Sequence, residues 1–247
     1  KNRRYSYRII FIPETIGSIA YINKNFAKLK KNVFAGFVVV CVGVDCTPSF
    51  LPSRQGNTIS DHAALISIKK NSKKFKRFSF LERGSDERQF CSEKVNLPIC
   101  SIMSKKYGDY KEYHTSLDNM NYISAKGLGK SFKIIKDAIL ILENTKKISN
   151  FFPVKKLKKN KKILKRDNIY KNIYKYPCEP KLSNYGLRKP ISFKTNYKFD
   201  KLVLNILMLS DGENSLNKIL KILKQKKSIV MKITKLLVKK KLLKCIY

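Results

Sequence analysis

Several kinds of site and segment are absent from this sequence. Its six cysteines include no C-x-x-C pair and have no histidine partners at zinc-finger spacing. No apolar run is long enough to cross a bilayer, and no stretch has the pattern of a signal peptide. Neither a zinc finger nor a membrane-spanning segment is therefore expected in this sequence. We therefore expect a cytoplasmic protein with reduced, mostly buried thiols and no membrane partner.

Negative charge is also scarce. The chain has 17 acidic residues against 54 basic ones, which gives a formal net charge of +37. Such an excess is typical of proteins that bind nucleic acid or an anionic surface. Only nine of the basic residues are arginine, however, and base-edge contacts depend heavily on arginine. Lysine, asparagine and isoleucine are enriched together, so an AT-rich genome is the preferred explanation of the charge, and functional polyanion binding stays an alternative.

The residues that are present suffice for a folded core. Of the 247 residues, 43% are hydrophobic, which argues against wholesale disorder. Lysine becomes denser after about residue 148, and prolines cluster between residues 177 and 190. We therefore predict an α/β domain at 1–148, a basic linker and extended segment at 149–196, and a small helical module at 197–247.

The pattern of apolar residues indicates alternating strands and helices in the first part. β-Branched and aromatic runs predict strands at 5–12, 33–43, 75–81 and 97–103. The valine-rich second run is expected to be a central strand that is buried on both faces. Apolar spacing predicts helices at 19–29, 58–70 and 131–142, and two prolines predict a loop at 47–56. The alternation indicates an α/β domain of three layers.

Polar residues able to bind a metal or move protons gather between residues 83 and 120. They are Asp86, Glu87, Glu112, His114 and Asp118. Glu14 and Asp45 likewise follow the first two predicted strands. Open α/β sheets bind ligands at the carboxyl ends of their strands, so we predict part of a metallohydrolase site here. Plainer explanations stay open, since Glu14 would favour a helix N-terminus and His114 would suit a surface loop.

The last fifty residues predict three short helices and a strand. The first helix would end near Asp211, Ser215 would cap the second, Ser228 would cap the third, and residues 242–247 would form the strand. This order suits a winged helix, whose third helix can enter a DNA major groove. No arginine, asparagine or glutamine there offers bidentate base readout, so we expect a docking module without specific DNA binding. The lysines that would contact nucleic acid include Lys232, Lys235 and Lys239.

Several stretches of the sequence resemble known motifs. FIPETIGSIAY at 11–21, GSD at 84–86 and YHTSLD at 113–118 occur in the same order as motifs of the co-catalytic di-zinc aminopeptidases. The runs LPSR, RGSDERQ, LPICS and KYGDYKEYHTSLDNM resemble more closely the bacterial aminopeptidase-like proteins that end in a winged helix and are often encoded with surface-polysaccharide genes. The resemblance implies a mixed sheet of the phosphorylase/hydrolase type, followed by a winged helix. It also implies zinc-dependent hydrolysis of a peptide or amide bond.

The resemblance also assigns roles to single positions. Glu14 would be the general base or a ligand, His114 would be a zinc ligand, and Asp45 or Asp86 would complete the ligand set. Other carboxylates would orient these groups through hydrogen bonds. They are Glu87, Glu112 and Asp118.

The chain departs from the family's pattern at two places. The pattern has two consecutive acidic residues where this chain has Glu14 and Thr15, and it requires an upstream His and a bridging Asp that nothing before Tyr5 supplies. We therefore expect an N-terminally truncated chain with an incomplete sheet and zinc site, inactive on its own. Two function classes stay open: a hydrolase acting on a peptide-like or amide substrate, and a non-catalytic protein whose basic module binds nucleic acid or a protein. A homo-oligomer is also left open.

Overall fold

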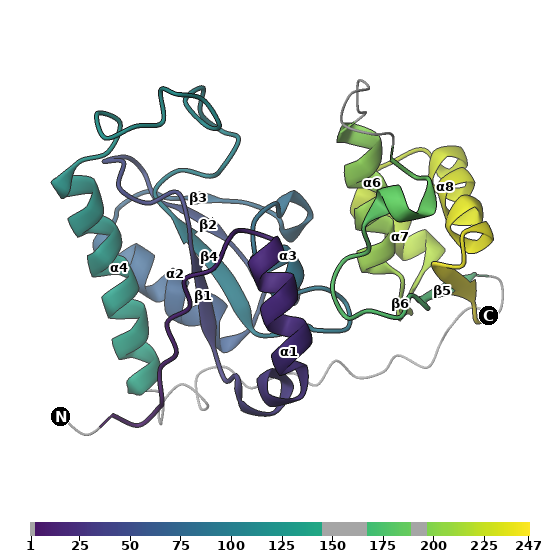
Figure 1. Cartoon of the computed structure of the whole chain (residues 1–247), viewed down its shortest axis with the longest axis horizontal. Coiled ribbons are helices and arrows are strands. Elements are labelled where there is room, and N and C mark those ends of the chain that lie inside the picture. The colour runs from purple at the N-terminus through teal and green to yellow at the C-terminus, as the bar shows by residue number, and fades with distance from the viewer. Residues whose placement is uncertain (1–2, 145–166, 189–196) are drawn as a thin grey trace. The chain divides into compact units, whose positions relative to one another are not determined.

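The computed structural model describes residues 3–144, 167–188 and 197–247. These residues belong to two compact units, which divide the chain between Val154 and Lys155 (Figure 1). Most of the basic stretch that we expected as a linker lies outside the described residues. Within the described ranges, every helix is too short or too polar to cross a bilayer.

The first unit is built around a mixed sheet with the strand order β1-β4-β2-β3. The strands are β1 (Gly36–Val39), β2 (Ser49–Leu51), β3 (Lys76–Arg77) and β4 (Ile99–Met103). β1 pairs with β4 in parallel, β4 with β2 in antiparallel fashion, and β2 with β3 in parallel. β4 is buried along its whole length, which its run of apolar residues predicts.

Helices cover both faces of this sheet. α1 (Ile16–Asn32) and the short α3 (Glu87–Phe90) lie on one face, and α2 (Ile59–Asn71) and α4 (Ala125–Glu143) lie on the other (Figure 1). The predicted three-layer α/β architecture is therefore confirmed. The main core fills the space between the sheet and the α2–α4 pair. Its buried members are Phe50, Ala64, Ile68, Cys100, Ile102, Ile134 and Ala138.

A capping box fixes the start of α2. The Thr58 side chain accepts a bond from the Asp61 amide, and the Asp61 carboxylate accepts one from the Thr58 amide at 2.8 Å. The same carboxylate accepts a bond from the Ser53 amide at 2.7 Å. Because Asp61 is fully buried, these donors compensate for the loss of water around its charge.

Three strand predictions need correction. The prediction of a strand at 5–12 is wrong, because this segment is irregular and most of it is exposed. The segment at 33–43 forms only the short β1, which lies at an edge of the described sheet and not at its centre. Within 75–81 only Lys76–Arg77 form a strand, and a 3-10 helix, η1 (Phe80–Glu82), follows.

One predicted loop is also wrong in part. Residues 47–56 contain β2, which is fully buried and lies between β4 and β3. The two prolines that suggested a loop, Pro48 and Pro52, flank the strand and do not interrupt it. Proline at a strand end costs no ladder hydrogen bond, so it permits this arrangement.

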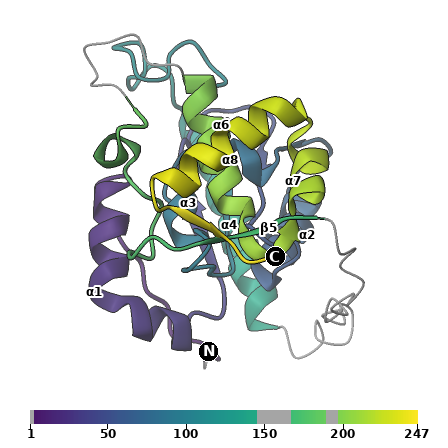
Figure 2. The same cartoon turned by 90° about the vertical axis from the view of Figure 1, so that its right-hand side faces the viewer.

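Among its described residues, the second unit combines three helices with a small sheet (Figure 2). Its helices are α6 (Tyr197–Leu209), α7 (Leu216–Leu223) and α8 (Lys227–Lys239), preceded by the 3-10 helix η3 (Leu182–Tyr185). β5 (Ile169–Asn172) pairs in antiparallel fashion with β6 (Asp211–Ser215) and with β7 (Leu243–Cys245). The three helices and the last strand match the sequence prediction. β5 lies in the stretch 149–196 that we expected to be linker.

One of the two predicted helix caps of this unit is correct and the other is wrong. Ser215 caps α7, and its hydroxyl accepts a bond from the Lys218 amide at 3.3 Å. Ser228 does not cap α8, because it lies inside the helix and Lys226 occupies the N-cap position without a side-chain bond. An N-cap must have a non-helical backbone, and here that backbone belongs to Lys226.

Candidate functional site

The parallel strands β1 and β4 end at the same edge of the sheet, where the segments that follow them meet. The Cys41 carbonyl, just beyond β1, accepts hydrogen bonds from the Ser104 and Lys105 amides, just beyond β4, at 3.1 and 3.5 Å. Cys41 has a φ of 49°, a left-handed conformation that is uncommon outside glycine. The Tyr110 hydroxyl forms a hydrogen bond with the Cys41 thiol. These bonds hold the loop after β4 over the end of β1.

Glu14 reaches this edge from the turn before α1. The next residue, Thr15, has a φ of 62°, and its amide donates a hydrogen bond to Oδ1 of Asp86 at 2.7 Å. This bond joins the Glu14 turn to the loop that precedes α3. Burial raises the pKa of the Cys41 thiol, and the negative charges of Glu14 and Asp118 add to the rise.

Glu87 is the internal anchor of the Asp86 loop. It is fully buried, and its Oε1 atom accepts bonds from the Gly84 amide at 2.8 Å, the Ser85 amide at 3.0 Å and the Tyr107 hydroxyl at 2.7 Å. Its Oε2 atom accepts a bond from the Ser101 hydroxyl on β4 at 3.0 Å. Burial raises the pKa of Tyr107, and the charge of Glu87 raises it further. The carboxylate therefore ties the loop to β4 and to Tyr107.

His114 lies in the loop after β4 with its side chain exposed. Its φ is 60°, and its ring stacks on the Tyr113 ring with centroids 3.9 Å apart. Two neighbours shape this loop, since the Glu112 carbonyl accepts bonds from the Thr115 amide at 3.1 Å and from the Thr115 hydroxyl at 2.7 Å. Asp118, four residues after His114, is also exposed.

Tyr113 is a partly buried tyrosine of the same loop. Burial raises the pKa of its hydroxyl, and negative charges on Glu14, Asp118 and Glu87 raise it further. Neither Tyr113 nor Cys41 was predicted from the sequence as a member of this edge. The sequence holds one signal for Tyr113, since tyrosines recur at every third position at 107, 110 and 113.

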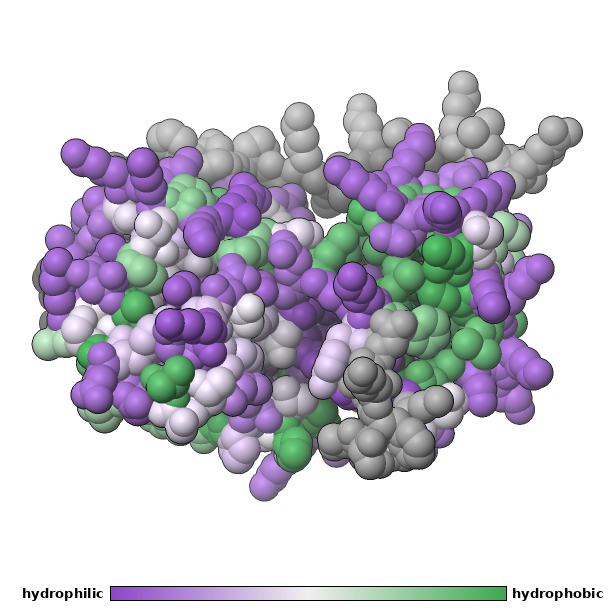
Figure 3. All heavy atoms as spheres, turned by 90° about the horizontal axis from the view of Figure 1, so that it is seen from above, coloured by the Kyte–Doolittle hydropathy of each residue, from purple (hydrophilic) through white to green (hydrophobic). Residues whose placement is uncertain are grey.

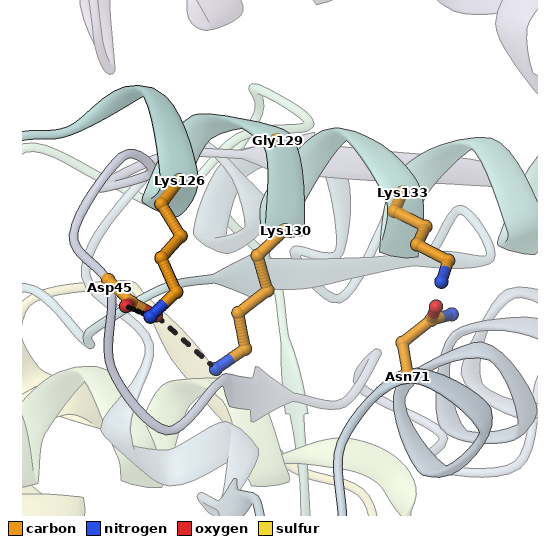
Figure 4. A pocket seen from close by; sticks show the side chains of 6 residues that line it. All are labelled: Asp45, Asn71, Lys126, Gly129, Lys130 and Lys133. Carbon is orange, nitrogen blue, oxygen red and sulfur yellow. Dashed lines mark ion pairs between the residues drawn. The ribbon is translucent and has the colours of Figure 1, made fainter.

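Asp45 has different partners from the other acidic residues. Its Oδ2 atom lies 2.7 Å from Nζ of Lys126, and its Oδ1 atom lies 3.9 Å from Nζ of Lys130 (Figure 4). The hydrogen bond with Lys126 holds the pKa of Asp45 below its ordinary value. These side chains, with Asn71 and Lys133, line an open pocket of about 460 Å³ beside the first half of α4. A metal at Asp45 would have to displace Lys126.

The described residues do not form a complete metal site. Within 3–144, 167–188 and 197–247, no group of three His, Cys, Asp or Glu side chains could hold a metal ion. A catalytic zinc ion needs three protein ligands. Glu14, Asp86 and His114 thus lie on segments that meet at one edge, yet they do not converge on a single point.

The predicted nucleic-acid contacts lie on one face of α8. Lys232, Lys235 and Lys239 are exposed, while Val230, Ile233 and Leu237 on the opposite face are buried. In the second unit, hydrophilic side chains surround an apolar area on the face seen in Figure 3. We call Lys232, Lys235 and Lys239 the α8 lysine stripe. It carries positive charge but no side chain that could pair with a base edge in bidentate fashion.

A solved structure indicates the class of protein. The chain aligns along 100% of its length with 50% of a crystal structure described as "putative peptidase from Clostridium acetobutylicum", with a TM-score of 0.55 and 30% sequence identity. The residues from 168 to 245 match a family model described as winged helix-turn-helix. The protein is therefore a mixed α/β protein with a C-terminal winged-helix region and a peptidase-like structural neighbour.

The family follows from a match over more than half of the chain. Residues 1–145 match the family described as Domain of unknown function (DUF4910), and the chain belongs to this family. A curated relative from C. acetobutylicum, named "Putative polysaccharide biosynthesis protein with aminopeptidase-like domain", is 34% identical over 214 residues. That match covers 86% of this chain and 44% of the relative. The chain thus spans about half the length of the relative and of the solved structure.

Proposed function

We propose that the first unit is part of an aminopeptidase-like hydrolase that cleaves a peptide or amide bond. One observation carries the proposal: the Thr15 amide donates a hydrogen bond to Asp86 at 2.7 Å and so joins the turn of Glu14 to the loop of Asp86. Two acidic residues from separate segments thereby lie on adjoining segments beside the loop that follows β4, in the region where open α/β sheets bind their ligands. The names of the relative and of the solved structure support peptidase-like chemistry.

The proposal gives each residue at this edge a task. Glu14 is the general base, because its exposed position at the sheet edge lets it take a proton from an attacking water. Asp86 and His114 are ligands of a zinc ion, and the hydrogen bond from Thr15 fixes the orientation of Asp86. Glu87 holds the Asp86 loop on β4. Two further carboxylates near His114, Glu112 and Asp118, would orient ligands. Asp45 stays paired with Lys126 and Lys130 and has no part in the zinc site.

This zinc site needs further ligands. The described residues supply no cluster of three, so we expect the chain alone to hold less than one zinc ion and to be inactive. The missing ligands would come from polypeptide of the kind that makes up the rest of the relative's length. A cytoplasmic setting belongs to the same proposal, since all six cysteines are free.

A chimera tests the proposal directly. In it, this chain replaces the segment of the C. acetobutylicum relative that it matches, and zinc content is measured by mass spectrometry beside hydrolysis of aminoacyl amides. We expect zinc and activity in the chimera, and loss of both in Asp86→Asn and His114→Ala. Asp109→Asn, which changes an exposed carboxylate in the same loop, should keep both. If the chimera and the relative both lack zinc and activity, the hydrolase proposal is wrong.

A second candidate function rests on the α8 lysine stripe. Its three exposed lysines share a face of α8 with no acidic residue on the helix, which suits weak contact with phosphates. We expect sequence-independent DNA binding that weakens steeply with salt. Replacing all three by glutamine should make the slope of log K against log salt shallower by about 3, since each phosphate contact contributes about 0.9.

The control for this test has the same change in charge. Lys24, Lys28 and Lys31 are exposed on α1, so their triple replacement by glutamine should leave the slope unchanged. Equal slopes for the two triple variants would show that only the overall charge attracts DNA. A sequence-specific complex that persists at physiological salt would reverse the order of the two proposals.

A further inference from the structure

We propose that the pocket beside the first half of α4 binds the phosphate or diphosphate group of a small soluble molecule. We call this hollow the α4 pocket. Within the part of the chain that the structure describes, its wall carries three ammonium groups and one carboxylate, a net charge of +2. The residues that line it are Asp45, Asn71, Lys126, Gly129, Lys130 and Lys133.

The three lysines of the α4 pocket project from one face of α4. Lys126, Lys130 and Lys133 follow one another at intervals of four and three residues, a spacing that makes side chains neighbours on a helix surface. Figure 4 shows all three extending from α4 toward the loop of Asp45 and toward Asn71 at the end of α2. Their ammonium groups can therefore approach a single anion from several directions, and lysine is a common phosphate ligand.

The positive charge of this wall is only partly neutralised. The Asp45 carboxylate lies 2.7 Å from the Lys126 ammonium and 3.9 Å from that of Lys130. Lys133 forms no ion pair with any residue that the structure describes. The Lys126 side chain is 83% exposed, so its ion pair with Asp45 is weak and a phosphate group can compete for the ammonium.

Other parts of the wall are already held in place. The Lys130 ammonium donates a hydrogen bond to the Cys46 carbonyl at 2.7 Å, which fixes it beside the loop after β1. At the end of α2, the Asn71 amide donates a bond to Asp137 at 2.8 Å, and Asp137 also pairs with Lys70 at 3.2 Å. This second carboxylate is thereby satisfied outside the pocket lining. Polar groups that are oriented in advance lose less entropy when a ligand binds.

Gly129 keeps the middle of the pocket wall open. It lies three residues after Lys126 and four before Lys133, on the same face of α4. Glycine destabilises a helix relative to alanine, and packing does not require it here, because no atom lies within 4 Å of an added Cβ. Gly127 differs, since its Cβ would lie 2.0 Å from the Gly43 carbonyl oxygen. The bare helix surface at Gly129 instead leaves room for a ligand between the flanking lysines.

The charge and size of the α4 pocket favour a phosphate group. A phosphate carries close to two negative charges and several acceptor oxygens, whereas a carboxylate carries one charge. The volume of about 460 Å³ lies within the range of small-molecule sites, about 300–1,000 Å³, and leaves room for a second phosphate or a small substituent. A nucleic-acid strand fits less well, because it needs a basic groove that follows its backbone over several nucleotides.

Titration of the full chain with pyrophosphate tests this site. Calorimetry at physiological salt measures the affinity, and NMR spectra of the ¹⁵N-labelled chain report the position through the Gly129 backbone amide. We expect saturable binding whose tightest step shifts the Gly129 signal. Gly56, which has open space around it and does not line the pocket, should keep its signal unchanged.

Lysine variants separate the α4 pocket from the general positive charge of the chain. Lys126→Gln and Lys133→Gln each remove one ammonium group from the wall, and we expect each to raise the Kd for pyrophosphate about 10-fold. Lys136→Gln is the matched control, because Lys136 is an exposed lysine of α4 that does not line the pocket. It should change the Kd by about 2-fold or less, since salt screens distant exposed charges.

Gly129→Leu tests the hollow itself without any change in charge. The leucine side chain would occupy the open wall between the lysines, so the Kd for pyrophosphate should rise at least about 10-fold. The Tm should stay equal or rise, because leucine favours a helix more than glycine does and meets no packed atoms at this position.

The outcomes decide for or against the α4 pocket. Equal weakening by Lys136→Gln, or unchanged binding in Gly129→Leu, would show that pyrophosphate responds to overall charge alone and would overturn the inference. DNA or phosphatidic-acid vesicles that bind through Lys126 and Lys133 when pyrophosphate does not would equally overturn it, in favour of a macromolecular surface or a membrane. Zinc content and hydrolysis play no part in these readouts, so the phosphate site and the hydrolase proposal can fail separately.

Discussion

Glu87 offers the sharpest test of how the candidate site is held together. Its carboxylate is fully buried and accepts four hydrogen bonds, from the Gly84 and Ser85 amides and from the Tyr107 and Ser101 hydroxyls. Glu87→Ala would leave all four donors without this acceptor. At about 1 kcal/mol for each donor, the free energy of unfolding of the first unit should fall by about 4 kcal/mol.

Hydrogen exchange is the suitable assay for this loss, because the chain has two units and one unfolding curve would mix them. Peptides that cover β4 report on the first unit alone. A loss of about 4 kcal/mol should speed their slowest exchange by about 1,000-fold. Glu87→Gln keeps the shape of the side chain and one oxygen acceptor, so it should lower the free energy of unfolding by only about 1–2 kcal/mol. This variant replaces Glu87→Ala in the experiment if the alanine variant does not fold.

The control is Glu82→Ala in the neighbouring 3-10 helix. Glu82 accepts a bond from the Ser79 amide at 2.9 Å, in an exposed position. Its loss should cost about 1 kcal/mol or less, as for other exposed caps. If Glu87→Ala costs no more than Glu82→Ala, the bonds of the buried carboxylate do not stabilise the loop, and the argument for Glu87 as its anchor is refuted.

Three further predictions follow from close contacts and titration. Gly127→Ala should destabilise the first unit by about 1–3 kcal/mol, because the new Cβ would lie 2.0 Å from a backbone oxygen, whereas Gly129→Ala, with open space around it, should be neutral or stabilising in thermal unfolding. Hydrogen bonds, that from Asn71 first, lower the pKa of Asp137 below 3.8. Its stabilising contribution is therefore complete above that pH and lost below it, and Asp137→Asn should flatten the acid limb of a plot of Tm against pH. Burial raises the pKa of Cys91 to about 12, so a maleimide at pH 8 should label the exposed Cys245 first and Cys91 only on unfolding.

Local sequence signals predicted correctly the elements that are stabilised by nearby residues or that are fully buried. The apolar run of β4, the spacing of α4 and the Ser215 cap all correspond to elements of the structure. Segment 5–12 failed for a physical reason, because its residues favour a strand but a strand also needs a neighbour. β2 was missed because its prolines signalled a loop, although they lie at its ends.

The reasoning from strand ends applies to only one of the three predicted site residues. The loop of His114 follows β4, whereas no strand precedes Glu14 and the 3-10 helix η1 precedes Asp86. The bond from Thr15 to Asp86 could not be read from a sequence, since it joins residues 71 positions apart through a backbone amide. The pairing of Asp45 with Lys126 was equally hidden, because one lysine among so many gives no signal of its own.

The tyrosines of the loop after β4 have a practical consequence for spectroscopy. The chain has no tryptophan, so tyrosine dominates its intrinsic fluorescence and near-ultraviolet circular dichroism. Tyr110 stacks on Tyr122 with centroids 5.4 Å apart, and Tyr113 stacks on His114. If tryptophan replaced Tyr113, its fluorescence would have no background from other tryptophans. The candidate site can thus carry an optical probe that reports directly on any ion or substrate that reaches His114.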